Sequence, residues 1–205
     1  RSFLPHPTRS RPKTTSPEGS DRSKQLTHQF HDELQHLKQT ILRMSGMVEQ
    51  AINESVHSLL EKDEARAHRV IDFDHQIDLL EMEIDELCLR LLALHQPVAI
   101  DLRFITAAMK INTDLERMGD LAVNIAERSL YLIHQPEINA GIDLKRMSDV
   151  AQSMVRESLD ALVRSDTAKA REICKSDDIL DNMNRQALNA LSNHMEQHPE
   201  DVKSA

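Results

Sequence analysis

The sequence predicts an all-α protein, because its composition and the spacing of its apolar residues both favour helices over strands. Aromatic residues make up only 2% of the 205 residues, tryptophan is absent and Gly occurs four times, whereas Leu, Ala, Met, Glu and Asp are abundant. Apolar residues form 40% of the chain, which is enough to build a core. From Phe30 onward they recur every three or four residues, as on one face of a helix, so we expect no β-sheet.

Three long antiparallel helices are expected in the first part of the chain. The first carries its apolar face from Phe30 to Leu59. The second is expected over residues 64–95, with Asp63 as its N-cap, and its apolar seam consists of Val70, Phe73, Ile77, Leu80, Ile84, Leu87, Leu91 and Leu94. The third runs from Asp101 to about Ile133, and its apolar face consists of Phe104, Ala108, Ile111, Leu115, Met118, Ala122 and Ile125.

Two further helices follow a linker that contains Gly141. Their apolar positions run from Met147 to Leu162 and from Ile173 to Met195. Residues 1–26, in contrast, hold four of the seven prolines, six basic and two acidic residues and almost nothing apolar, so we predict a disordered basic tail. We expect a first repeat over residues 27–135 and a second over residues 142–205.

The two halves resemble each other at an offset of 103 residues, which indicates an internal repeat. In the first half the matched residues are Met44, Glu54, Ser55, Leu59, Asp63, Ala65, Ala67, Asp74 and Asp78, and in the second they are Met147, Glu157, Ser158, Leu162, Asp166, Ala168, Ala170, Asp177 and Asp181. By this offset a counterpart of the third helix would begin near residue 203. We therefore expect the second repeat to be incomplete in this chain.

Oxygen-bearing side chains line one edge of the second and of the third expected helix. On the second these are Asp74, Asp78, Glu81 and Asp85, and on the third they are Asn112, Glu116, Asp120, Asn124 and Glu127. Like charges four residues apart repel each other, and a bound cation would remove that cost. Oxygen ligands favour hard cations such as Mg, Mn, Ca or ferric iron over zinc. A solvated acidic face without metal is the alternative.

Two segments around the third helix carry a more specific signal. Residues 96–103 read QPVAIDLR and residues 114–127 read DLERMGDLAVNIAE. Together with the tandem repeat, these segments resemble the PhoU family over about residues 27–205. The resemblance implies two antiparallel three-helix bundles, the last helix of the second being truncated or absent here. It also implies metal sites formed by paired E(D)xxxD motifs on adjacent helices.

The resemblance assigns metal ligands residue by residue. Glu116 and Asp120 match the motif on the third helix, Asp74 and Asp78 fit the partner motif on the second, and Asn124 extends the same face. Asp177 and Asp181 are the corresponding pair in the second repeat. The identity of the metal ion is left open, and iron, manganese, magnesium and zinc are the candidates.

The resemblance further implies a non-enzymatic negative regulator of phosphate uptake and phosphate-starvation signalling. Its implied partners are a second copy of itself, the nucleotide-binding subunit of a phosphate ABC transporter and a sensor histidine kinase. The formal net charge of -9 argues against nucleic acid as a partner. No apolar run approaches the ~18 residues of a membrane span, and no CxxC pair occurs, so we expect a cytoplasmic protein.

Two other functions remain possible at this point. One is a carboxylate-bridged metal enzyme in a helical bundle, with the same four carboxylates as ligands. The other is a soluble domain attached to a sodium-phosphate cotransporter, which the basic tail and the lack of spans do not favour. Of the two cysteines, Cys88 and Cys174, both are expected to be core thiols.

Overall fold

The protein consists of five α-helices and one short 3-10 helix, in a computed structural model that describes residues 17–136, 138 and 140–203. The elements are α1 (Pro17–Glu61), α2 (Glu64–His95), α3 (Ala99–Leu132), α4 (Leu144–Arg164), α5 (Thr167–Gln197) and η1 (Pro199–Lys203). Within these described residues no strand occurs. The all-α prediction is confirmed, and α2 has the bounds that its capping residues predict.

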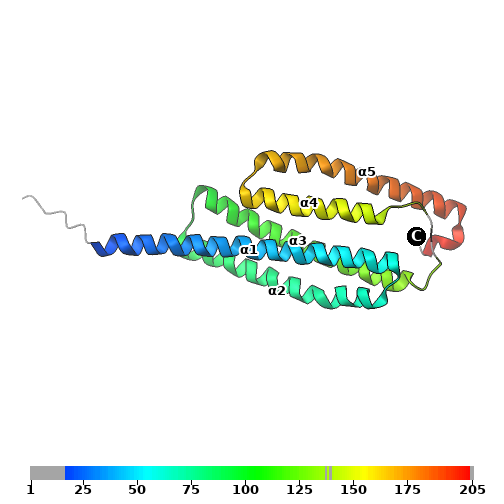
Figure 1. The fold of residues 1–205 in the computed structure, drawn as a ribbon, viewed down its shortest axis with the longest axis horizontal. Helices are drawn as coiled ribbons and strands as arrows, with labels where there is room; N and C mark the ends of the chain where they lie inside the picture. The colour runs from blue at the N-terminus through cyan, green and yellow to red at the C-terminus, as the bar shows by residue number, and fades with distance from the viewer. Residues whose placement is uncertain (1–16, 137, 139, 204–205) are drawn as a thin grey trace, which may run out of the picture.

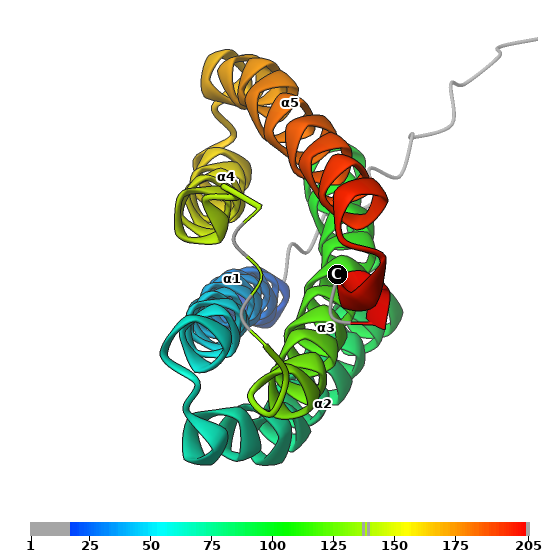
Figure 2. The same ribbon diagram turned by 90° about the vertical axis from the view of Figure 1, so that its right-hand side faces the viewer.

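Helices α1, α2 and α3 form an antiparallel bundle in which each helix packs against the other two (Figure 1). The second repeat is added to one side of this bundle. Helix α4 packs along α1, and α5 packs on α4 (Figure 2). Among the described elements, α5 contacts only α4 and η1, so it has fewer neighbours than its repeat counterpart α2.

The core lies inside the α1–α3 bundle and uses most of the apolar positions expected on α1 and α2, although Leu94 at the end of the expected α2 seam is 63% exposed. On α3 only Ala108, Leu115 and Ala122 of the expected face are buried, whereas Ile105, which was not expected there, is fully buried. The largest fully buried apolar side chains of the core are Leu37, Ile41, Met44, Val48, Ile77, Ile84, Leu91 and Ile105. Helix α3 contributes mainly small residues, namely Ala108, Gly119, Ala122, Ala126 and Ser129. Small side chains on α3 allow its backbone to approach the neighbouring helices closely.

The internal repeat is visible in the turns that connect α1 to α2 and α4 to α5. Asp63 caps α2 by accepting a 2.9 Å hydrogen bond from the backbone N–H of Arg66. Asp166, its counterpart 103 residues later, accepts bonds of 3.1 and 3.0 Å from two backbone N–H groups of α5. Lys62 and Ser165, one residue before each cap, both adopt left-handed backbone conformations with φ of 56°. The two turns therefore share one conformation.

Two further expectations differ from the structure. Helix α1 begins at Pro17, so residues 17–26 of the expected tail are helical, whereas residues 1–16 lie outside the described residues. Proline is well suited to the first turn of a helix, where its missing N–H costs nothing. Cys88 is buried as expected, but Cys174 is exposed because α5 has few packing neighbours.

No helix of the described part is both long and apolar enough to cross a bilayer. The most extended helix, α1, is polar along much of its length and its first turns project beyond the end of the bundle (Figure 1).

Candidate metal centre

The oxygen-bearing residues of α2 and α3 lie where these two helices pack against each other. We call Asp74, Asp78, Glu81 and Asp85 the α2 row, and Asn112, Glu116, Asp120 and Asn124 the α3 row. All four members of the α2 row are half-buried. A purely solvated acidic face would leave its carboxylates exposed. The partial burial of the α2 row against α3 therefore differs from that alternative.

Burial decreases steadily along the α3 row. Asn112 is fully buried, Glu116 is half-buried, and Asp120 and Asn124 are exposed. Successive members are four residues apart, whereas a helix turn takes 3.6, so each step rotates the side chain by about 40° around the axis. The row consequently turns away from α2 toward solvent, and Asn124 lies farthest from the interface.

Gly119 brings α3 close to the α2 row. It is buried, and a Cβ atom at this position would lie 3.2 Å from Oδ1 of Asp74 and 3.2 Å from Cδ1 of Ile77. Both distances are tighter than ordinary van der Waals contact. A glycine therefore permits this approach despite its cost within a helix, which is about 1 kcal/mol relative to alanine.

The electrostatics show that the two rows face each other. Desolvation is the largest cause that raises the pKa of Asp74, followed by the negative charges of Asp78 and Asp120. Desolvation also leads the causes that raise the pKa of Glu116, followed by Asp120, Glu81 and Asp78. Carboxylates from the two helices thus act on each other, and bringing them together costs free energy.

The donor set suits a hard cation, although the side chains are not arranged around one. Its ligands are carboxylate oxygens, which Mg, Mn, Ca and ferric iron prefer, and their mutual repulsion would be relieved by positive charge. Yet within the described residues no three His, Cys, Asp or Glu side chains form a ready metal-holding group. A metal would therefore have to draw these carboxylates together by rotating side chains that are only partly buried.

Three predicted ligands are not brought to this interface. Asn124 is exposed on α3 beyond Asp120. Asp177 and Asp181 are exposed on α5, and none of the described helices packs on α5 as α3 packs on α2. Conversely, the ligand prediction left out Glu81, whose charge acts on Glu116. Its position seven residues after Asp74 was the signal in the sequence that could have found it.

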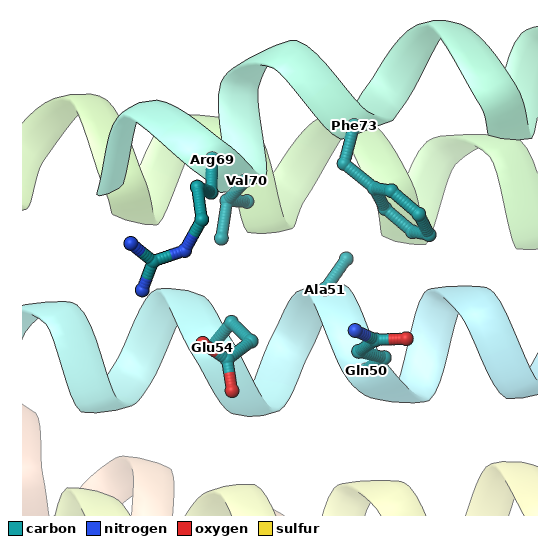
Figure 3. Close-up of a pocket in the computed structure, with 6 residues that line it drawn as sticks. All are labelled: Gln50, Ala51, Glu54, Arg69, Val70 and Phe73. Carbon is teal, nitrogen blue, oxygen red and sulfur yellow. The ribbon is translucent and has the colours of Figure 1, made fainter. Parts of the chain in front are cut away.

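Three hollows in the described part lie away from the two rows. One of about 160 Å³ lies between α1 and α2, with Glu54 and Arg69 at one end and Phe73 at the other (Figure 3). Another of about 500 Å³ lies at the end of the bundle beside the linker, and a third of about 270 Å³ lies between α4 and α5. None of these three is lined by a residue of the α2 or α3 row.

Comparison with known proteins resolves the family. The model of the PhoU domain family matches residues 41–129 and 144–205, which together make up most of the chain. The chain belongs to the PhoU family. The fold agrees, since the crystal structure of PhoU from Pseudomonas aeruginosa has a TM-score of 0.81 with it at 35% identity, covering 85% of this chain and 84% of that one.

Two curated PhoU relatives show how far the likeness extends. The phosphate-specific transport system accessory protein PhoU homolog of Pseudomonas putida is 41% identical over 116 residues, covering 57% of this chain and 45% of the relative. The homolog of the same name from Aquifex aeolicus is 43% identical over 106 residues, covering 52% of this chain and 48% of the relative. These matches span about half the length of the curated relatives.

Proposed function

We propose that this PhoU-family chain is a non-enzymatic negative regulator of phosphate uptake and of phosphate-starvation signalling. In this role it links a phosphate ABC transporter, through the nucleotide-binding subunit, to a sensor histidine kinase on the cytoplasmic side. The proposal is supported by family membership and by the names of the relatives, which describe accessory proteins of phosphate-specific transport systems. The observation that carries its metal-dependent part is the pair of facing rows on α2 and α3.

The proposed metal ligands are Asp74, Asp78, Glu116 and Asp120, with Glu81 as a further oxygen donor. A hard cation here would supply the positive charge that the repelling carboxylates lack, and iron, manganese, magnesium and zinc remain the candidates. The chain's contribution is to hold these carboxylates, which bind metal in their ionised form, on two adjacent helices. Metal binding would thereby fix the spacing of α2 and α3 and the outer surface that they present to a partner.

The other predicted ligands, Asn124, Asp177 and Asp181, lie away from these four carboxylates. Asn124 could reach a metal only at the exposed end of the α3 row. Asp177 and Asp181 could contribute to a second site only if another group supplied the ligands that α3 supplies in the first repeat. A second copy of the chain is likewise a proposed partner, and light scattering of the purified protein would measure the oligomeric state.

The metal assignment is tested by replacing both α3 carboxylates. Glu116→Ala combined with Asp120→Ala should abolish metal uptake, measured by elemental analysis after purification, while circular dichroism keeps its helical signal. Asp114→Ala is the matched control, because Asp114 lies on the same helix with a side chain that is 63% exposed and pairs with Arg117 at 3.7 Å. Unchanged metal content in the double variant would refute the ligand assignment.

The regulatory role is tested in cells grown with abundant phosphate. Deletion of the gene should activate phosphate-scavenging genes, and the wild-type gene should restore repression. The Glu116→Ala, Asp120→Ala variant tells whether repression needs the carboxylates. If deletion leaves these genes silent, the regulatory proposal fails and the metal-enzyme alternative gains ground, even though the three hollows described above lie elsewhere.

A further inference from the structure

Asn112 is a fully buried amide in the interface between α2 and α3. Its Nδ2 donates one hydrogen bond of 2.9 Å to the backbone carbonyl of Glu81 and another of 3.0 Å to Oδ1 of Asp85. Both amide hydrogens are therefore used on α2, the neighbouring helix. Hydrogen bonds to a buried amide have a fixed direction and length, unlike the apolar contacts around them.

Apart from the close approach at Gly119, the rest of the buried α3 face makes mostly apolar contacts, which have no preferred direction. Most of its other buried residues are small or apolar, namely Ile105, Ala108, Leu115, Gly119, Ala122 and Ala126. A face of this kind can pack in several positions along a partner helix, and a single buried Asn is a known way to select one of them. A slip of one turn, about 5.4 Å, would remove both acceptors from Asn112 and leave its amide buried and unpaired.

Starting from Asn112, successive members of the α3 row lie near successive members of the α2 row. Glu116 lies one turn beyond Asn112 on α3 and is within electrostatic range of Asp78. Asp120 lies two turns beyond and is within range of Asp74. Because the helices are antiparallel, each step forward on α3 is a step backward on α2. The position at which Asn112 is held thus decides which carboxylates stand opposite each other.

We propose that Asn112 is a positioning residue that, through its bonds to α2, sets the register in which the α2 and α3 carboxylates face one another and so sets their affinity for metal. This inference rests on the proposed metal-binding function. It differs from a role in filling the core, because an apolar side chain of similar size would fill the same space without fixing the register.

Titration of the purified protein with Mn²⁺ alone separates these two roles. Asn112→Leu keeps the volume and removes the buried amide, so the protein should stay folded while its Mn²⁺ affinity falls about 10- to 100-fold, as for other residues that orient metal ligands. Asp85→Ala should lower the affinity in the same way. Asp85→Asn should retain most of it, because the amide oxygen still accepts a hydrogen bond from Asn112.

A second measurement needs no metal. Spin labels at Leu89→Cys and Arg117→Cys, both at exposed sites and in a Cys174→Ser background, report the position of α3 along α2 by pulsed electron paramagnetic resonance. We expect one narrow distance distribution with Asn112 or with Asp85→Asn. A broadened or shifted distribution is expected with Asn112→Leu or Asp85→Ala. Ser129→Ala is the control, because it removes another fully buried polar side chain from α3.

The outcomes separate the two proposals. If Asn112→Leu folds, binds Mn²⁺ as tightly as wild type and gives the same distance distribution, the positioning role is refuted. If wild type binds Mn²⁺ no better than the Glu116→Ala, Asp120→Ala variant, the metal function fails, and the distances alone then show whether the register depends on Asn112. Should Asn112→Leu not fold, the two Asp85 variants give the same comparison from α2.

Discussion

Replacing Asp120 by Asn should stabilise the metal-free protein, which is the opposite of what most substitutions do. The charge of Asp120 acts on Glu116, four residues earlier on α3, and on Asp74 across the interface. A like-charge pair of this kind costs about 0.2 to 0.5 kcal/mol. Removing both pairs should therefore raise the free energy of unfolding by about 0.4 to 1 kcal/mol, because Asn keeps the size of Asp without its charge.

The expected stabilisation is measurable by thermal and urea unfolding in the presence of a chelator. For a chain of this size 1 kcal/mol corresponds to about 2 to 4 °C, so Tm should rise by about 1 to 4 °C. Asp114→Asn is the matched control on the same helix, since Asp114 pairs with Arg117 and lies outside the two rows. Its effect should stay within about 0.5 kcal/mol.

Adding metal should reverse the order of stabilities. At a metal concentration of about 100 times Kd, wild type gains about 2.7 kcal/mol, whereas Asp120→Asn, having lost a ligand, gains little. Wild type should then be the more stable protein by roughly 2 kcal/mol. If Asp120→Asn is destabilised without metal, or if the order stays the same with metal, the facing carboxylates do not repel and are not held by a cation as we infer.

Three further predictions follow from other contacts. Because the folded state raises the pKa of Asp74 and Glu116, the unfolding free energy of the metal-free protein should fall as pH rises through those raised values, whereas metal affinity should increase over the same range. Urea unfolding and Mn²⁺ titration at a series of pH values would measure both trends. An unfolding free energy that rises with pH, or a metal affinity that falls, would contradict the prediction. Gly119→Val should destabilise the fold by about 1 to 3 kcal/mol through overpacking against α2, measured by urea unfolding, and an unchanged midpoint would mean that the helices can move apart freely. Glu49 accepts hydrogen bonds of 3.0 and 2.6 Å from Arg156, and Glu49→Gln should weaken them. Amide hydrogen exchange should then become faster in α4 and α5 but not in α2. An equal change of the exchange rate in all helices would argue that this contact does not hold the second repeat on α1.

Short-range signals allowed much of the fold to be predicted. The bounds of α2 follow from Asp63, which caps its first turn, and from Pro97, which lies just beyond its end. The apolar seam of α2 predicts most of the residues that enter the core, because helical periodicity separates Ile77 and Leu91 from their exposed neighbours, but Leu94 at the end of the seam is exposed. Signals of this kind depend on a few consecutive residues and need no knowledge of neighbouring helices.

Other features depend on how many helices surround a residue. Cys88 and Cys174 occupy similar helical patterns, yet only Cys88 is buried, because α2 packs within a bundle and α5 packs on one helix and η1. The start of α1 was placed too late, since residues 17–26 lack the apolar side chains that mark a helix by packing. Helix propensity and a proline in the first turn are weaker signals than periodicity.

For the candidate site, the sequence by itself determined that Asp74 and Asp78 share an edge of one helix and that Glu116 and Asp120 share an edge of the next, because the helical period dictates both. Only the tertiary structure decided that these edges face each other, that Asn112 is buried between the helices and that Asn124 is not. The rotation of each helix about its axis and its position along its neighbour are set by packing and by buried hydrogen bonds. Neither quantity can be obtained from the spacing of residues within a single helix.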